Sequence, residues 1–169
     1  MIVDVQSRLS LAIMGDQQHS GLPALNGKKI IYDFGDETHL NLVVKYYNDK
    51  SKPLYPLIYN VQNKSIQESN RNLAEVDLKL IIATRNSHTE YKNTQRWATS
   101  YKNVLFPVAS FLDTLFSKQS IFLWDGNYDL LEFPNYGNAK ENETIDILDC
   151  LRFDTKIKIN NNCLKTIKY

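Results

Sequence analysis

The segment AEVDLKLIIAT, residues 74–84, alternates polar and apolar residues along most of its length. Every second residue from Val76 to Ile82 is apolar, namely Val76, Leu78, Leu80 and Ile82. The residues that alternate with them are Glu75, Asp77, Lys79 and Ile81. Successive side chains of a β-strand point to opposite faces, so this spacing places the first four residues on the same face. The segment therefore predicts a long strand with one face in the core.

A second segment, RWATSYKNVLFPVASFLDTLF at residues 96–116, has apolar residues three and four positions apart, which is typical of a helix with one buried face. The stripe consists of Trp97, Tyr101, Val104, Leu105, Val108, Phe111, Leu112 and Leu115. Pro107 lies in its middle, and proline removes one backbone hydrogen bond and clashes with the carbonyl four residues earlier. We therefore expect the helix to kink near Asn103 and Val104 or to form two segments. Trp97 and Phe111 belong to the stripe and are expected in the core.

The remaining segments extend this pattern along the chain. A helix is expected over residues 2–14, ended by Gly15. Strands are expected at 28–35, 39–48, 54–62 and 120–126, and one long or two short strands at 144–160. Pro56 cannot donate to a ladder, so the strand that contains it begins late or lies at an edge. Residues 127–144 contain many turn-forming residues and are expected to form a loop.

The composition fits a single α+β domain spanning residues 1–169. A chain of this length buries on the order of 70% of its unfolded surface, so it needs no disulfide or metal to hold a core. Lysine and arginine number 20 against 19 acidic residues, and the net charge of +1 argues against a strongly basic nucleic-acid domain. Cys150 and Cys163 lack CxxC spacing and are expected to be reduced. No apolar run approaches the roughly 20 residues that span a bilayer, so we expect a soluble, unsecreted protein with no membrane partner.

The order of these elements and several short motifs resemble the tail terminator proteins of long-tailed bacteriophages and related ring proteins of the head-to-tail junction. The motifs are YPLIYNV at 55–61, VDLKLIIAT at 76–84, the helix segment at 91–115 and DILDCLRFDTKIKI at 146–159. Members of this group often have an LYP-like element in the helix, which here is Leu105, Phe106 and Pro107. The resemblance covers roughly residues 1–160. It implies an antiparallel β-sheet with an N-terminal helix and a second, proline-kinked helix packed on the sheet.

The resemblance also implies a function. Such proteins form homo-oligomeric rings of six or twelve subunits, contact neighbouring ring, portal or tail proteins, and surround a channel through which DNA passes without sequence recognition. It therefore implies a non-enzymatic structural protein of the virion neck or tail, assembled in the cytoplasm of the bacterial host. The near-neutral charge fits a channel wall, because a wall that bound phosphates strongly would obstruct the passage of DNA.

The alternative is a small metal-dependent nuclease or a nucleic-acid-binding protein. Asp77 and Lys79 match the Asp-x-Lys half of a nuclease core, in which a second acid shares Mg²⁺. Both lie on the polar phase of their strand, and the nearest upstream acids in a strand context are the distant Asp33 and Asp36. The histidines lack metal-ligand spacing, and the sequence has no glycine-rich phosphate motif and no GxSxG motif. We therefore predict no catalytic residue, no metal and no cofactor.

Aromatic residues provide the remaining functional signal. Trp124, Tyr128, Phe133 and Tyr136 fall in or beside the expected loop. Exposed aromatic residues at the end of a strand are natural anchors for a protein partner. Apolar loop residues also fold back and cover a satellite core. We predict these four residues as an interface of the ring, and the covering role remains the open alternative.

Overall fold

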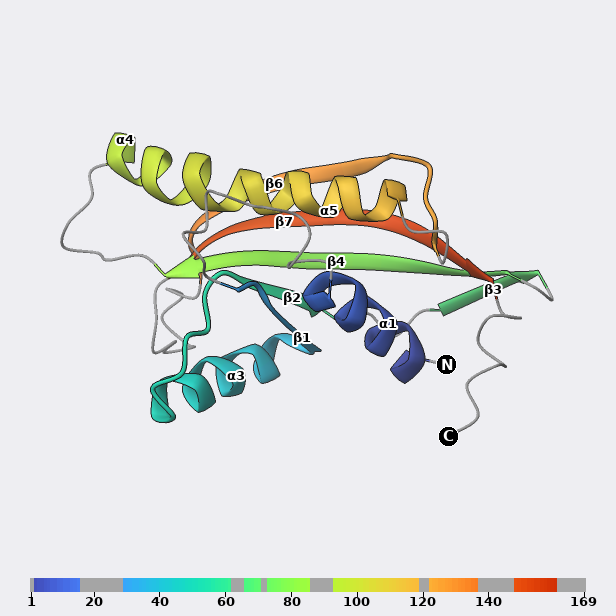
Figure 1. Cartoon of the computed structure of the whole chain (residues 1–169), viewed down its shortest axis with the longest axis horizontal. Coiled ribbons are helices and arrows are strands. Elements are labelled where there is room, and N and C mark those ends of the chain that lie inside the picture. Colours follow the sequence, from blue (N-terminus) through green and yellow to red (C-terminus); the bar gives the residue numbers. More distant parts are fainter. Residues whose placement is uncertain are drawn as a thin grey trace.

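The computed structural model describes residues 2–15, 29–61, 66–70, 73–85, 93–118, 122–136 and 148–160 (Figure 1). In chain order the elements are α1 (Ile2–Gly15), β1 (Ile31–Gly35), α3 (Glu37–Asp49), β2 (Leu57–Val61), β3 (Ile66–Asn70) and β4 (Leu73–Arg85). They are followed by α4 (Asn93–Arg96), η2 (Trp97–Leu105), α5 (Phe106–Lys118), β5 (Phe122–Leu123), β6 (Tyr128–Tyr136) and β7 (Leu148–Asn160). Within these ranges, no helix has both the length and the apolar character needed to cross a bilayer.

The strands form one mixed sheet, in which β1, β2, β4 and β7 lie side by side in that order. β5 and β6 pair with the outer edge of β7, and β3 pairs with β4 beyond the end of β2. β1 and β2 run parallel, whereas the other described pairs are antiparallel. The predicted α+β class is confirmed, but the expectation of a wholly antiparallel sheet is wrong at β1 and β2. The reason is α3, which provides the helical crossover that parallel neighbours require.

β4 and β7 form the centre of the sheet. They pair along their whole lengths, from Leu73 opposite Asn160 to Arg85 opposite Leu148. β4 confirms the strand predicted from the alternation at 74–84, and β7 is one long strand rather than two. β2 begins directly after Pro56, as its missing N–H predicts.

The larger core lies between one face of the sheet and the helices α1, η2 and α5. Six apolar residues of the two periodic segments meet there, each at most 1% exposed: Leu78, Leu80, Ile82, Leu105, Val108 and Leu112. The predicted buried faces of the strand and of the helix therefore pack against each other. The opposite face of the sheet packs against α3, with Ile81 and Ala83 buried beneath the helix. β4 is thus covered on both faces at its C-terminal end.

Residues 39–48 form most of the helix α3 and not the predicted strand. The Asp36 carboxylate accepts a hydrogen bond from the His39 backbone N–H at 2.7 Å, which caps the first turn. Leu40, Val43 and Val44 are buried and follow helical spacing. The β-branched and aromatic residues of this segment favoured a strand, but packing against the sheet overrides that propensity.

Residues 128–136 form a strand, β6, where a loop was expected. β6 pairs with β7 from Tyr128 opposite Thr155 to Tyr136 opposite Leu148, with a register shift after Phe133. The shift coincides with Pro134, which has no N–H to donate to a ladder. An edge strand tolerates such a residue, which explains why the turn-forming composition was misleading. Residues 137–144 of the expected loop lie outside the described residues.

The long helix consists of two segments of different winding, which is one of the two outcomes predicted for Pro107. η2 is a π-helix, in which hydrogen bonds join residues five apart. The N–H of Phe106 accordingly donates to the carbonyl of Tyr101. α5 then continues as an ordinary α-helix from Phe106 through Pro107 to Lys118. Pro107 therefore lies in the first turn of an α-helical segment, where proline is tolerated.

The junction between α4 and η2 separates a largely buried from an exposed side chain. Arg96, the last residue of α4, has a side chain that is only 12% exposed, whereas Trp97, the first residue of η2, is 49% exposed. The expectation that Trp97 belongs to the core is wrong, since its side chain is 49% exposed and its ring lies beside that of the half-buried Phe106. Phe111, on the α-helical part, is 4% exposed as predicted.

Candidate functional site

Trp124 and Tyr128, two of the four predicted interface residues, lie against the sheet. The indole Nε1–H of Trp124 donates to the Thr155 hydroxyl at 2.7 Å, and Thr155 donates to the Asn127 carbonyl at 2.7 Å. The Tyr128 ring stacks on Phe153 with centroids 4.5 Å apart, and Trp124 stacks on Tyr128 at 6.0 Å. Both rings therefore help to cover the larger core.

Phe133 and Tyr136, the other two predicted interface residues, lie on β6. Phe133 is half-buried and packs against the core beneath α3, with the Arg152 guanidinium 5.5 Å from its ring centroid. Tyr136 lies opposite Leu148 in the ladder, and its side chain is outside the described part of the chain. The three described aromatic side chains thus pack against the protein's own residues, Tyr128 is also 39% exposed, and their part in an interface stays a prediction.

Three leucines are exposed at this edge of the sheet in addition to Tyr128, and the sequence analysis did not single them out. Leu123 on β5 is 57% exposed, and Leu130 and Leu131 on β6 are 36% and 41% exposed. Residues 122–136 also contain three acidic residues and no lysine or arginine. β6 pairs with β7 alone among the described strands, so its other side is an edge of the described sheet. We name Leu123, Tyr128, Asp129, Leu130, Leu131 and Glu132 the acidic edge.

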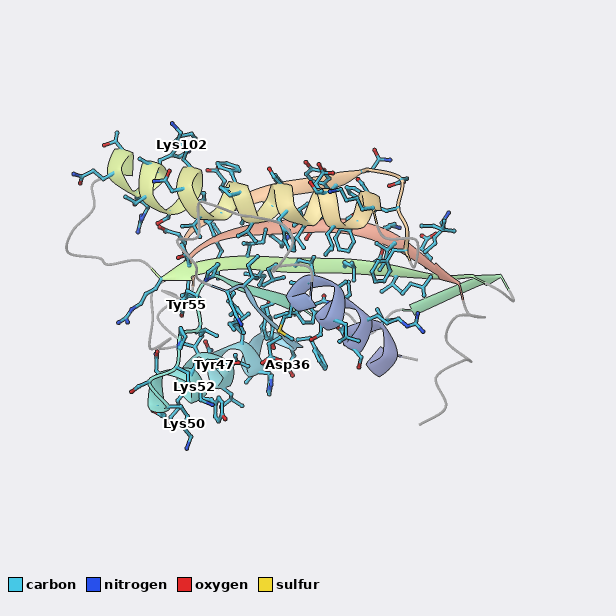
Figure 2. The ribbon with its side chains drawn as sticks, in the orientation of Figure 1. Asp36, Tyr47, Lys50, Lys52, Tyr55 and Lys102 are labelled. Atoms are coloured by element: carbon cyan, nitrogen blue, oxygen red, sulfur yellow. The ribbon has the colours of Figure 1, made fainter. Side chains whose placement is uncertain are left out.

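α3 presents a second exposed apolar surface, on the side of the helix that faces away from the sheet. Leu42 and Tyr46 are 58% and 53% exposed and lie one helical turn apart. Three exposed lysines accompany them: Lys45 on the same side of the helix, and Lys50 and Lys52 just after its end. Figure 2 shows Lys50 and Lys52 together at this end of α3. We name Leu42, Lys45, Tyr46, Lys50 and Lys52 the basic helix face.

The acidic edge and the basic helix face lie on opposite sides of the molecule, as Figure 1 shows for β6 and the C-terminal end of α3. The sheet order gives the same result, because α3 contacts β1 at one end of the order, whereas β5 and β6 lie at the other end. The opposite charges of the two surfaces are therefore too far apart to neutralise each other within one chain.

Charged residues on the open half of the α3-side sheet face pair with one another. Lys156 Nζ lies 3.4 Å from an Asp77 carboxylate oxygen and 3.6 Å from a Glu75 oxygen. The negative charge of Asp77 raises the pKa of Lys156, since it favours the protonated amine. Arg152 similarly lies 2.8 Å from Asp154. These charges are neutralised locally.

The charged residues of the acidic edge and of the basic helix face, unlike those of the sheet face, are not paired locally with described residues. Asp129, Glu132 and the three lysines of the basic helix face form no ion pair with another described residue. These charged side chains are exposed, on two surfaces that also expose apolar side chains.

The residues of the nuclease alternative lie apart. An open depression of about 640 Å³ has Asp77 and Lys79 in its lining, and neither Asp33 nor Asp36 contributes to it. Asp33 accepts a hydrogen bond from the Phe34 N–H, and Asp36 caps α3. Among the residues that the structure describes, no three His, Cys, Asp or Glu side chains are arranged to hold a metal ion.

A buried ion pair lies beneath η2, and nothing in the sequence pattern indicated it. Arg96 Nε is 3.2 Å from Asp149 Oδ1, and the two side chains are 12% and 0% exposed. The Tyr101 hydroxyl is buried nearby and has no hydrogen-bond partner among the described residues. Burial, together with the negative charge of Asp149, raises the pKa of Tyr101. Burial likewise raises the pKa of the free thiol of Cys150, the next residue of β7, while Cys163 lies outside the described residues.

No protein-family model matches this chain, and a search of curated proteins finds no match either. Its function therefore has to be inferred from the surfaces that the fold presents.

Proposed function

We propose that this protein is a non-enzymatic structural subunit of a homo-oligomeric ring in the neck or tail of a bacteriophage particle. The observation that carries the proposal is the presence of two unlike exposed surfaces, the acidic edge and the basic helix face, on opposite sides of one chain. A contact that joins two different surfaces of identical subunits is heterologous. Repeated heterologous contacts build a closed ring when the rotation from each subunit to the next adds up to a full turn. A two-fold dimer would instead use the same surface on both subunits.

The exposed leucines of β6 support an assembled state. An uncovered edge strand with apolar residues on both faces can pair with strands of other protein molecules and so cause aggregation. Leu130 and Leu131 point to opposite faces of β6, because they are neighbours in a strand. A neighbouring subunit that covers this edge removes the hazard, and each leucine gains part of the roughly 1.5–3 kcal/mol that full burial provides.

The order of elements supports the particular kind of ring. The N-terminal helix, the sheet and the proline-containing helix follow the order of tail terminator and head-to-tail ring proteins, which the sequence resembles. The parallel β1–α3–β2 unit is an addition that the resemblance did not include. With a net charge of +1, such subunits would surround passing DNA without strong attraction to its phosphates. Neighbouring ring, portal or tail proteins would contact the two flat sides of the ring.

Light scattering of the purified protein, together with negative-stain electron microscopy, tests the proposal. We expect a mass of several subunits and images of a ring with a central opening. A protein that stays monomeric at every concentration would overturn the proposal. A monomer that cleaves DNA only in the presence of Mg²⁺, and loses this activity in Asp77→Ala, would establish the nuclease alternative instead.

A further inference from the structure

We infer that the acidic edge of one subunit docks on the basic helix face of the next, so that each contact in the ring joins a sheet edge to a helix. This inference rests on the proposed ring and goes further, because it names both contacting surfaces. The occupant of each surface is a second copy of this chain.

Charge complementarity favours this pairing. The acidic edge carries Asp129 and Glu132 on a segment without basic residues, and the basic helix face carries three lysines near a single acid, Asp49. Neither set is neutralised by a described residue of its own chain, whereas the charges of the sheet face between them pair with one another. Complementary charges of this kind guide association and fix the orientation of the partners.

The apolar residues of the two surfaces also match. The acidic edge exposes leucines and Tyr128, and the basic helix face exposes Leu42 and Tyr46. Each surface thus has the composition of a docking interface, with apolar and aromatic residues flanked by charges. Docking of one on the other would cover both apolar groups and bring the opposite charges together.

The position of the lysines argues against a purely local role. Lysines near the end of a helix also interact with its dipole, and this effect accounts for Lys50. It does not account for Lys45, which lies in the helix beside Leu42 and Tyr46 on the same outward side. The basic helix face therefore extends along the helix beyond its terminal turn.

Two charge-reversal variants test the pairing. The first reverses the acidic edge with Asp129→Lys and Glu132→Lys, and the second reverses the basic helix face with Lys45→Glu and Lys50→Glu. Each variant alone brings like charges together at the contact, which we expect to weaken self-association about 100-fold. The matched control is Lys102→Glu with Lys118→Glu, exposed lysines on η2 and α5 outside both surfaces. Lys102 lies on the side of the molecule opposite Lys50 (Figure 2), and the control is expected to assemble like the wild type.

Mixing the two variants gives the decisive measurement. In the first variant both surfaces are positive, and in the second variant both are negative. When subunits of the two variants alternate around the ring, every contact therefore joins a positive surface to a negative one. We expect the equimolar mixture to regain the mass of the wild-type ring by light scattering. A chain with all four substitutions has both surfaces reversed and is expected to assemble alone. Assembly of the wild type should also weaken as sodium chloride is raised, because salt screens exposed charges.

The outcomes separate this inference from the proposed function. A monomeric wild type overturns both. A wild-type ring together with rings in both variants overturns the edge-to-helix pairing and leaves the ring intact. Variants that are monomeric, folded by circular dichroism and still monomeric when mixed also overturn the pairing. If a charge-reversed variant fails to fold, the milder variant Asp129→Asn with Glu132→Gln replaces it. If the assembly of this milder variant depends on salt as strongly as that of the wild type, the pairing is overturned.

Discussion

Arg96 Nε lies 3.2 Å from Asp149 Oδ1, and this buried contact joins the start of the π-helical segment to the central strand β7. Arg96 directly precedes η2 and its side chain is 12% exposed, whereas the next residue, Trp97, is 49% exposed. Removal of one partner takes an opposite charge away from a group that stays buried, whereas replacement of both by apolar residues avoids that cost.

Arg96→Met is therefore expected to lower the free energy of unfolding by about 3–5 kcal/mol. The double variant Arg96→Met with Asp149→Leu should recover most of this loss, since it buries no charge. Urea denaturation followed by circular dichroism measures both variants. A single variant as stable as the wild type would show that the pair contributes nothing to the attachment of η2.

Leu80 lies at the meeting point of β4 and the long helix and is fully buried. Leu80→Ala is expected to destabilise the fold by about 2–5 kcal/mol, because it removes buried methyl groups and leaves a cavity. The matched control is Leu123→Ala at a 57% exposed position, which should change stability by less than about 0.5 kcal/mol. Equal effects at the two positions would contradict the described packing.

Two buried tyrosines should respond differently to the loss of their hydroxyl groups. The Tyr32 hydroxyl donates to Gln6 Oε1, which also accepts from Asn60 Nδ2 at 3.1 Å. Tyr32→Phe leaves this buried network incomplete and should cost about 1–3 kcal/mol. Tyr101→Phe removes a hydroxyl that has no hydrogen-bond partner among the described residues, so it should be neutral or stabilising. Thermal unfolding of the two variants side by side provides the measurement, and a larger loss at Tyr101 would reverse this assignment.

Stability is expected to fall at alkaline pH. Burial raises the pKa of Tyr32 and Tyr101 above the ordinary value of 10.0, and that of Cys150 above 9.0. Below pH 9 these groups are protonated in both the folded and the unfolded chain, so their contribution to stability is fully present. As pH rises further, the unfolded chain releases these protons first, and the free energy of unfolding decreases. Urea midpoints between pH 8 and pH 11 measure the slope, which should be shallower in Tyr101→Phe; an equal slope would exclude this tyrosine as a contributor.

Trp124→Ala distinguishes the covering role from the docking role of the aromatic residues. The indole packs against the larger core and donates to Thr155, so we expect a loss of about 2–4 kcal/mol for this half-buried residue. The variant should still assemble at low temperature, where enough folded protein remains. Unchanged stability together with lost assembly would instead restore Trp124 as a docking anchor.

Elements whose side chains repeat with one regular period could be predicted from the sequence. The alternation at 74–84 predicted β4, and the spacing of Phe111 and Leu112 predicted the buried face of α5. α3 was missed although Leu40, Val43 and Val44 have helical spacing, because branched and aromatic residues outweighed that signal. The Asp36 cap was the local clue.

The candidate surfaces were only partly predictable. The segment was identified through its aromatic residues, of which Trp124 and Phe133 pack against the cores, whereas Tyr128 and three leucines are exposed. Residues 128–133 have no regular polar–apolar alternation, and the nearby turn formers and Pro134 favoured a loop, so β6 was missed. The burial of Arg96 could not be predicted, because arginine is mostly exposed unless it is paired, and its partner Asp149 lies on a strand distant in sequence.

The position of β7 in the sheet has a consequence for the order of events during synthesis. β7 is the last described strand to leave the ribosome, and it is the pairing partner of β4, β5 and β6. β6 pairs with no other described strand, so it has no ladder to join until β7 has emerged. The pairing of β4 with β7 joins segments that are distant in sequence, and such contacts form slowly. The nascent chain therefore cannot present a finished acidic edge, and a subunit becomes competent for association only after β7 has been translated.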